Sequence, residues 1–376
     1  MIVRSYVPRS EMAFLTQAQE TQPRICGGWV ATLPELIIDF GKSTVLPAAV
    51  RTLALSIASK QAQHTVKFAT LWQSYGSTLG LLRQSLRHDH GTYNCEHLAA
   101  MMCLTLTELL VNTQTGDPII HIDGLASMFR NLGPAFFAQG VPHKLFVGFR
   151  PLLVLQSIIS RSQSFIAHES WKTIPFLYIS PSPMQELLTE AVTIASVLEK
   201  FDLISTQSSS ETQNCRRILQ DEFDSVLQRL DSWKETYESK SPGPLYWPHT
   251  ADAPRGEDIW LWFDSVVAAN ALTHYWAFTA ICLVHSQKLN FADAARIVDN
   301  TTRTRKQYAE ALSMICQSIP FLFEDSHALY GPSSVAFLLN TVVTVLKIDE
   351  ELYGSRIAIN QNLVDYAKAR GFYWVS

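Results

Sequence analysis

The sequence predicts an all-α protein: a large bundle of about ten or more helices in a single compact body. Apolar residues recur in alternating steps of four and three, which places them on one face of a helix. The clearest stripes are Leu187, Ala191, Ile194, Leu198 and Phe201, and then Leu219, Phe223, Val226, Leu230, Trp233 and Tyr237. Strand signals are weak, because alternating β-branched runs between turn residues are missing. Hydrophobic residues make up 47% of the 376 residues, enough for a thick helical core.

In chain order, the predicted helices cover 47–63, 66–87, 95–112, 118–131, 143–167, 187–201, 219–237, 259–285, 290–317 and 333–352. A polar loop at 205–212 separates the two striped helices. Segment 240–258 carries four prolines and two glycines and cannot be regular helix. Segment 259–285 has no Lys or Arg and Asp264 as its single acid. We interpret it as the buried centre of a bundle, not a membrane span, because polar residues interrupt it and its flanks lack a basic side.

The charge balance excludes several classes of partner. The formal net charge is −4, and no run of five residues is basic. Phosphate neutralisation and polybasic membrane binding both need clustered Lys and Arg, so we expect neither nucleic-acid nor membrane binding.

The N-terminal sequence lacks the apolar core of a signal peptide, which predicts an intracellular protein of the nucleus or cytoplasm. The six cysteines lie far apart and are interpreted as buried free thiols.

One cluster has the donor types of a zinc or iron site. It consists of His88, His90, Cys95 and His97 in the stretch HDHGTYNCEH. Histidines and a glycine are also ordinary content of a solvated loop between two helices, and we prefer that interpretation. The sequence therefore predicts neither a metal nor a cofactor.

Aromatic residues crowd into and just before the long apolar segment. The candidate ligand-binding residues there are Trp260, Trp262, His274, Tyr275 and Trp276. Such a wall accepts an apolar ligand or a cation, and it is equally typical of ordinary core. A second candidate pair is Asp123 and Arg130, which share a helix face about 10.5 Å apart along the axis. They either line a polar pocket or order a neighbouring loop.

Seven segments, in order, resemble the fungal-specific transcription factor domain, the helical regulatory half of zinc binuclear-cluster regulators. They are LPAAVRTLALSIASKQAQ (46–63), YGSTLGLLRQSL (75–86), LAAMMCLTLTELL (98–110), HIDGLASMFRNLGP (121–134), SRSQSFIAHESWKTIPF (160–176), ANALTHYWAFTAICL (269–283) and ICQSIPFLF (315–323). The resemblance spans roughly residues 46 to 350. It implies a helical domain over 46–376, with an internal Pro-rich loop at 240–258, preceded by an extension over 1–45.

Within this resemblance, the stretch 160–176 matches a family signature. The matching residues are Arg161, Phe165, Glu169, Trp171, Pro175 and Phe176. We interpret them as architecture: a helix ending near Glu169, a tryptophan that anchors its exit and a proline that stops the helix. The family's DNA-binding module has six closely spaced cysteines, whereas residues 1–45 contain Cys26 alone. The chain is therefore expected not to bind DNA as those regulators do.

Three functions follow from this resemblance. The first is a regulator without its own DNA-binding module, in a fungal secondary-metabolite pathway, which responds to a hydrophobic small molecule, to another regulator or to self-association. The second is a repurposed domain acting as a cofactor-independent cyclase or isomerase on a polyketide or terpenoid intermediate. The third is a scaffold. For the enzyme, the candidates are His274, Tyr275, His121 and Asp123, the His and Asp for proton transfer, with Arg130 as an anion stabiliser.

Overall fold

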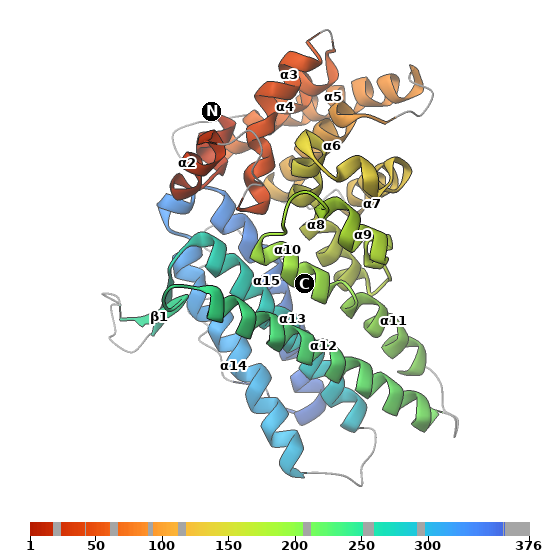
Figure 1. Ribbon diagram of the computed structural model, residues 1–376, viewed down its shortest axis with the longest axis vertical. Coiled ribbons are helices and arrows are strands. Elements are labelled where there is room, and N and C mark those ends of the chain that lie inside the picture. The colour runs from red at the N-terminus through yellow and green to blue at the C-terminus, as the bar shows by residue number, and fades with distance from the viewer. Residues whose placement is uncertain are drawn as a thin grey trace. The chain divides into compact units, whose positions relative to one another are not determined.

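The protein is all-α, as predicted, in a computed structural model (Figure 1). The structure describes residues 1–17, 24–41, 43–60, 67–88, 93–111, 118–205, 212–250, 259–291, 298–355 and 357. The chain divides into two compact units. Unit 1 comprises Met1–Gln156, His168–Ser182 and Ala328–Ser333, and unit 2 comprises Ser157–Ala167, Pro183–His327 and Ser334–Ser376.

Unit 1 contains the helices of the N-terminal half of the chain. They are α1 (Ile2–Tyr6), α2 (Arg9–Gln17), α3 (Leu33–Asp39), α4 (Val45–Ser59), α5 (Phe68–His88), α6 (Cys95–Val111), α7 (Pro118–Leu132), most of α8 (Gly140–Ser160) and α9 (Glu169–Thr173). In this unit, α6 packs against α3, α4, α5 and α7. Short 3₁₀ segments at Cys26–Thr32, Pro134–Phe137 and Ile174–Phe176 connect them. The predicted extension contributes α1 to α3 to this unit, and Tyr6 and Trp29 from it are buried.

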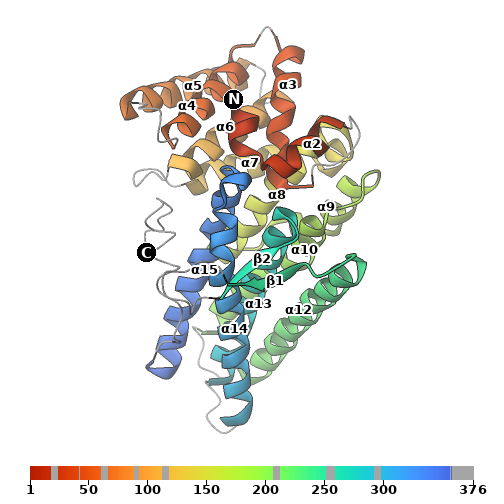
Figure 2. The same ribbon diagram turned by 90° about the vertical axis from the view of Figure 1, so that its left-hand side faces the viewer.

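Unit 2 contains the long helices. They are α10 (Pro183–Ala191), α11 (Ile194–Ser205), α12 (Thr212–Lys240), α13 (Val266–Phe291), α14 (Val298–Leu322) and most of α15 (Tyr330–Tyr353), with 3₁₀ segments at Phe165–Ala167 and Asp325–His327. Helix α13 lies between α12 and α14 in both views (Figures 1 and 2). Of the described helices, α13 and α15 are long and apolar enough to cross a membrane by length and composition, and 94% of the apolar window in α13 is buried inside the protein.

The prediction of one helix over 259–285 is wrong at its N-terminal end. Residues Trp260–Phe263 form strand β2, which pairs in antiparallel register with β1 (Tyr246–His249). The sequence WLWF alternates half-buried and buried side chains, the period-2 pattern of a strand. Helix α13 then begins at Val266, where the Ser265 hydroxyl accepts a hydrogen bond from the Ala268 N–H at 3.2 Å and caps the helix.

The helix predicted to end near Glu169 is also placed differently. Helix α8 ends at Ser160, Arg161 has a left-handed φ of 53°, and Glu169 opens the short helix α9. The start of α9 is fixed by a local cap, because His168 Nδ1 accepts a hydrogen bond from the Ser170 N–H at 3.3 Å.

The signature residues nonetheless make architectural contacts. In unit 1, Trp171 packs against Phe137 and Phe146, with ring centroids 5.9 Å apart in each pair. In unit 2, the Arg161 guanidinium donates to both carboxylate oxygens of Asp202, at 2.6 and 2.7 Å. It also donates to Nε2 of the buried His285 at 2.9 Å. Each of these side chains orders its own unit.

Candidate functional site

Helices α12, α13 and α14 enclose a partly open groove of about 700 Å³ in unit 2. Its lining residues are Gln220, Asp224, Leu227, Asp231 and Lys234 from α12, Tyr275, Trp276, Thr279, Leu283, Ser286 and Asn290 from α13, and Arg303, Thr304, Gln307, Glu310, Ala311 and Met314 from α14. Small-molecule sites have volumes of roughly 300–1,000 Å³. The groove is therefore the candidate functional site of this protein.

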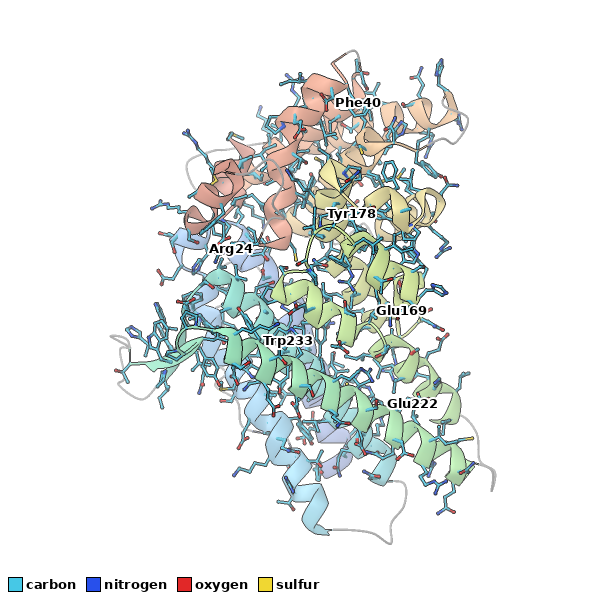
Figure 3. All side chains as sticks on the ribbon, in the orientation of Figure 1. Arg24, Phe40, Glu169, Tyr178, Glu222 and Trp233 are labelled. Carbon is cyan, nitrogen blue, oxygen red and sulfur yellow. The ribbon has the colours of Figure 1, made fainter. Side chains whose placement is uncertain are left out.

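Helix α12 supplies its wall of the groove because it carries two parallel stripes. The predicted apolar stripe, from Leu219 to Trp233, is buried in the core. Tyr237, the last member of the predicted stripe, is half-buried. Trp233 is labelled in Figure 3, and its indole N–H donates to the Pro183 carbonyl at 3.1 Å. The groove residues from Gln220 to Lys234 repeat the same steps of four and three, displaced by one residue. Burial of the apolar stripe in the core sets the rotation of α12 about its axis, and the second stripe therefore faces the groove.

One end of the groove is polar. The Gln220 side-chain amide donates to Ser286 Oγ at 2.7 Å, and the Ser286 hydroxyl donates back to Gln220 Oε1 at 3.1 Å. The same amide donates to Asp224 Oδ1 at 3.0 Å. Burial raises the pKa of Asp224 above its ordinary value, and the neighbouring charge of Asp221 adds to this effect.

The other end of the groove is aromatic. The Tyr275 hydroxyl donates to Asp231 Oδ1 at 2.6 Å, and the Tyr275 ring lies 5.9 Å from that of Trp233. Burial, followed by the hydrogen bond to Asp231, raises the pKa of Tyr275 well above its ordinary value. The phenol therefore stays protonated at neutral pH and serves as a hydrogen-bond donor. Trp276 is packed against Tyr246 of β1, with ring centroids 5.5 Å apart.

The structure separates the five predicted ligand-binding residues. Tyr275 and Trp276 line the groove. Trp260 and Trp262 lie on one face of the hairpin, with nearly parallel rings whose centroids are 6.4 Å apart. His249 of β1 packs against Trp262 at 4.6 Å.

His274 points away from the groove. Its ring stacks on Phe337 of α15, with centroids 5.7 Å apart, and its Nδ1 donates to the Asn270 carbonyl at 2.8 Å. Burial lowers the pKa of His274 to about 4, so the imidazole is neutral at physiological pH. In this position it holds α13 against α15.

The remaining predicted catalytic residues belong to unit 1. Asp123 and Arg130 are both exposed on α7, and the Asp123 carbonyl accepts a hydrogen bond from the Ser127 hydroxyl at 3.0 Å. His121 lies in the same helix, but its side chain is outside the part of the chain that the structure describes.

The histidine and cysteine cluster is partly described. His88 is exposed at the end of α5, Cys95 begins α6, and His90 falls outside the described residues. His97 is buried, with its Nε2 3.0 Å from Ser85 Oγ. Within the described ranges, no group of three or more His, Cys, Asp or Glu side chains is placed to hold a metal ion.

Sequence reasoning missed the polar residues of the groove. Gln220, Asp231 and Arg303 lie on helix faces whose composition is typical of a solvated surface. Which helices contact each other cannot be derived from the sequence pattern alone. The one available signal was the second stripe on α12, whose members at three- and four-residue steps include Leu227 among polar residues.

No protein-family model matches the chain, and no curated protein or solved structure does so either. The resemblance to the fungal-specific transcription factor domain stays a prediction from the sequence.

Proposed function

We propose that this chain is a regulatory protein without its own DNA-binding module, which responds to a hydrophobic small molecule bound in the groove between α12, α13 and α14. A fungal secondary-metabolite pathway is the expected setting, and the nucleus or cytoplasm is the expected location. The observation that carries the proposal is the groove itself, with a volume of about 700 Å³ and both aromatic and hydrogen-bonding walls. These are the size and the mixed chemistry of a small-molecule site.

The walls of the groove suit reversible binding. Three long helices supply them, and two hydrogen bonds, from Gln220 to Ser286 and from Tyr275 to Asp231, join α12 to α13. A ligand that contacts all three helices favours one arrangement of them over others. Such differential binding is the physical basis of regulation by a ligand. A partner protein would then bind one arrangement of the helices of unit 2 in preference to the others.

A second function, cyclisation or isomerisation of a biosynthetic intermediate, is favoured by one observation. The Tyr275 hydroxyl and the Asp231 carboxylate form a 2.6 Å hydrogen bond at the aromatic end of the groove. A protonated phenol beside a carboxylate offers a donor and an acceptor of protons to a substrate held against Trp276. This would be catalysis without a cofactor, by shape and proton transfer.

A gene replacement distinguishes these functions. The substitution Gln307→Trp fills the groove from α14, where Gln307 is exposed, so its cost to the fold is small. Ser313→Trp is the matched control, because Ser313 is exposed on the same helix and does not line the groove. Strains carrying a gene deletion or either variant are compared by metabolite profiling and transcript measurement together.

For a ligand-dependent regulator, the deletion and Gln307→Trp both change transcript levels of the pathway genes, and Ser313→Trp does not. Normal transcripts with an accumulated intermediate would contradict regulation and support the enzyme. Unchanged transcripts and metabolites in the deletion strain would contradict both functions.

A further inference from the structure

The groove has a direction, and its two ends differ in chemistry. The hydrogen bonds from Gln220 to Ser286 and from Tyr275 to Asp231 tie the same two helices together at both ends. Eleven residues separate the two bonded positions on each helix, so α12 and α13 run antiparallel and the bonds lie about 16 Å apart. A ligand that fills the groove lengthwise is therefore elongated.

Helix α14 adds to this chemical difference between the two ends of the groove. It follows α13 in the chain and packs beside it (Figure 2), so its first turns lie near the last turns of α13. Arg303 and Thr304 consequently join Asn290 at the polar end of the groove, whereas Met314 joins Tyr275 and Trp276 at the aromatic end. Between the two ends, the lining includes Leu227, Leu283 and Ala311.

The charges of the groove single out Arg303. Lys234 is paired with Glu238 at 2.7 Å, Glu310 lies 3.8 Å from Lys306, and Asp231 accepts the Tyr275 hydroxyl. Asp224 accepts a hydrogen bond from Gln220. Arg303 lines the groove and is exposed, and no other residue that the structure describes forms an ion pair or hydrogen bond with its side chain. Among the described residues of the groove, it is the cation that is available to a ligand.

We propose, on the basis of the ligand-binding function proposed above, that the groove takes an elongated molecule with an aromatic or polycyclic body and a carboxylate head. The body lies between Tyr275, Trp276 and Met314, and the carboxylate pairs with the Arg303 guanidinium. A planar guanidinium matches a carboxylate with two parallel hydrogen bonds. Thr304 and Asn290 supply further donors at the same end of the groove.

The test is a fluorescence titration of the full chain with 1-pyrenebutyrate and with its uncharged methyl ester. The wild type is expected to bind the carboxylate about tenfold more tightly than the ester, the usual effect of one charge-assisted hydrogen-bonded pair. Arg303→Gln should remove this preference, so that the carboxylate binds no more tightly than the ester. Arg217→Gln, which removes an exposed arginine of α12 outside the groove, should keep the preference.

The groove-filling variant Gln307→Trp separates the two proposals. If both compounds bind equally to the wild type and Gln307→Trp abolishes both, the groove binds ligands but the carboxylate head is wrong. If Arg303→Gln keeps the preference for the carboxylate, Arg303 is not its partner, and this inference fails alone. If neither compound binds, or if Gln307→Trp leaves binding intact, the ligand-binding function of the groove fails as well.

Discussion

The two sides of helix α13 both carry side chains at steps of three and four residues, and they have opposite surroundings. One side, the closed face, consists of His274, Phe278, Ile281 and His285 and packs against other helices. The other, the open face, consists of Tyr275, Thr279, Leu283 and Ser286 and lines the groove. Both faces follow steps of four and three along one helix. The spacing of residues along a helix therefore reports which side chains share a face, and it does not report whether a neighbour covers that face.

The two faces also satisfy their polar groups differently. On the closed face, His274 and His285 each donate from Nδ1 to the backbone carbonyl four residues earlier, both at 2.8 Å, and His285 Nε2 also accepts a hydrogen bond from Arg161. On the open face, Tyr275 and Ser286 bond instead to Asp231 and Gln220 of α12. Polar groups that bond within their own helix can be buried without a partner helix of matching chemistry. Polar groups that reach across a groove need such a partner, or water.

The largest expected contrast between the faces is in packing. Phe278 is fully buried beside Phe337, with ring centroids 5.8 Å apart, so Phe278→Ala should leave a cavity and destabilise the protein by about 3–5 kcal/mol. Thr279→Ala on the open face should cost about 1 kcal/mol or less, because Thr279 lines the groove and the loss of its small side chain leaves no enclosed cavity. Urea unfolding of the full chain, followed by circular dichroism, measures both. Equal losses would contradict the assignment of closed and open faces.

The second contrast is in acid sensitivity. The folded-state pKa of His274 is lowered to about 4 by burial, and that of His285 is lowered to about 4 by burial and the Arg161 charge. Because the pKa is lower in the folded state, the histidine is protonated in the unfolded chain and neutral in the folded chain at pH values between the two pKa values. Stability is therefore lost as the pH falls from about 6.5 toward 4.

For His274 alone, the loss between pH 7 and pH 5 amounts to about 2 kcal/mol. His274→Gln should remove this part of the acid-induced loss of stability, because glutamine stays neutral and can still donate to the Asn270 carbonyl. The measurement is the urea midpoint of the full chain at pH 7 and pH 5, for wild type and variant. If the midpoint of the variant falls as far as that of the wild type, His274 is not buried as described.

These two faces show how much the sequence could predict. The fold class, the apolar stripe of α12 and the burial of α13 followed from the period of apolar residues. The stripe from Leu187 to Phe201 was predicted as one helix and is divided between α10 and α11, although its residues are buried. The strand Trp260–Phe263 did not, because four aromatic and apolar residues beside a longer apolar run read as part of a helix. Tyr275 and Trp276 were predicted for the ligand site and line the groove, whereas their neighbour His274 turns the other way. One residue along a helix is a rotation of about 100°, and the positions of α12 and α15 decide which side is covered.

The smallest expected effect tests the open face most directly, because the protein contains a matched pair of hydrogen bonds. Tyr275 donates to Asp231 and Tyr308 donates to Asp349, both at 2.6 Å. Asp349 is fully buried and Asp231 is exposed. Asp349 also accepts two hydrogen bonds from Arg305, both at 3.0 Å. Tyr308→Phe removes one donor from this buried carboxylate, and water cannot replace it, so the change should cost about 2 kcal/mol. Tyr275→Phe should cost about 1 kcal/mol or less, because water in the groove can solvate Asp231. Losses of similar size in urea unfolding would mean that side chains, not solvent, fill the space beside Asp231, and the groove would then have no room for a ligand at its aromatic end.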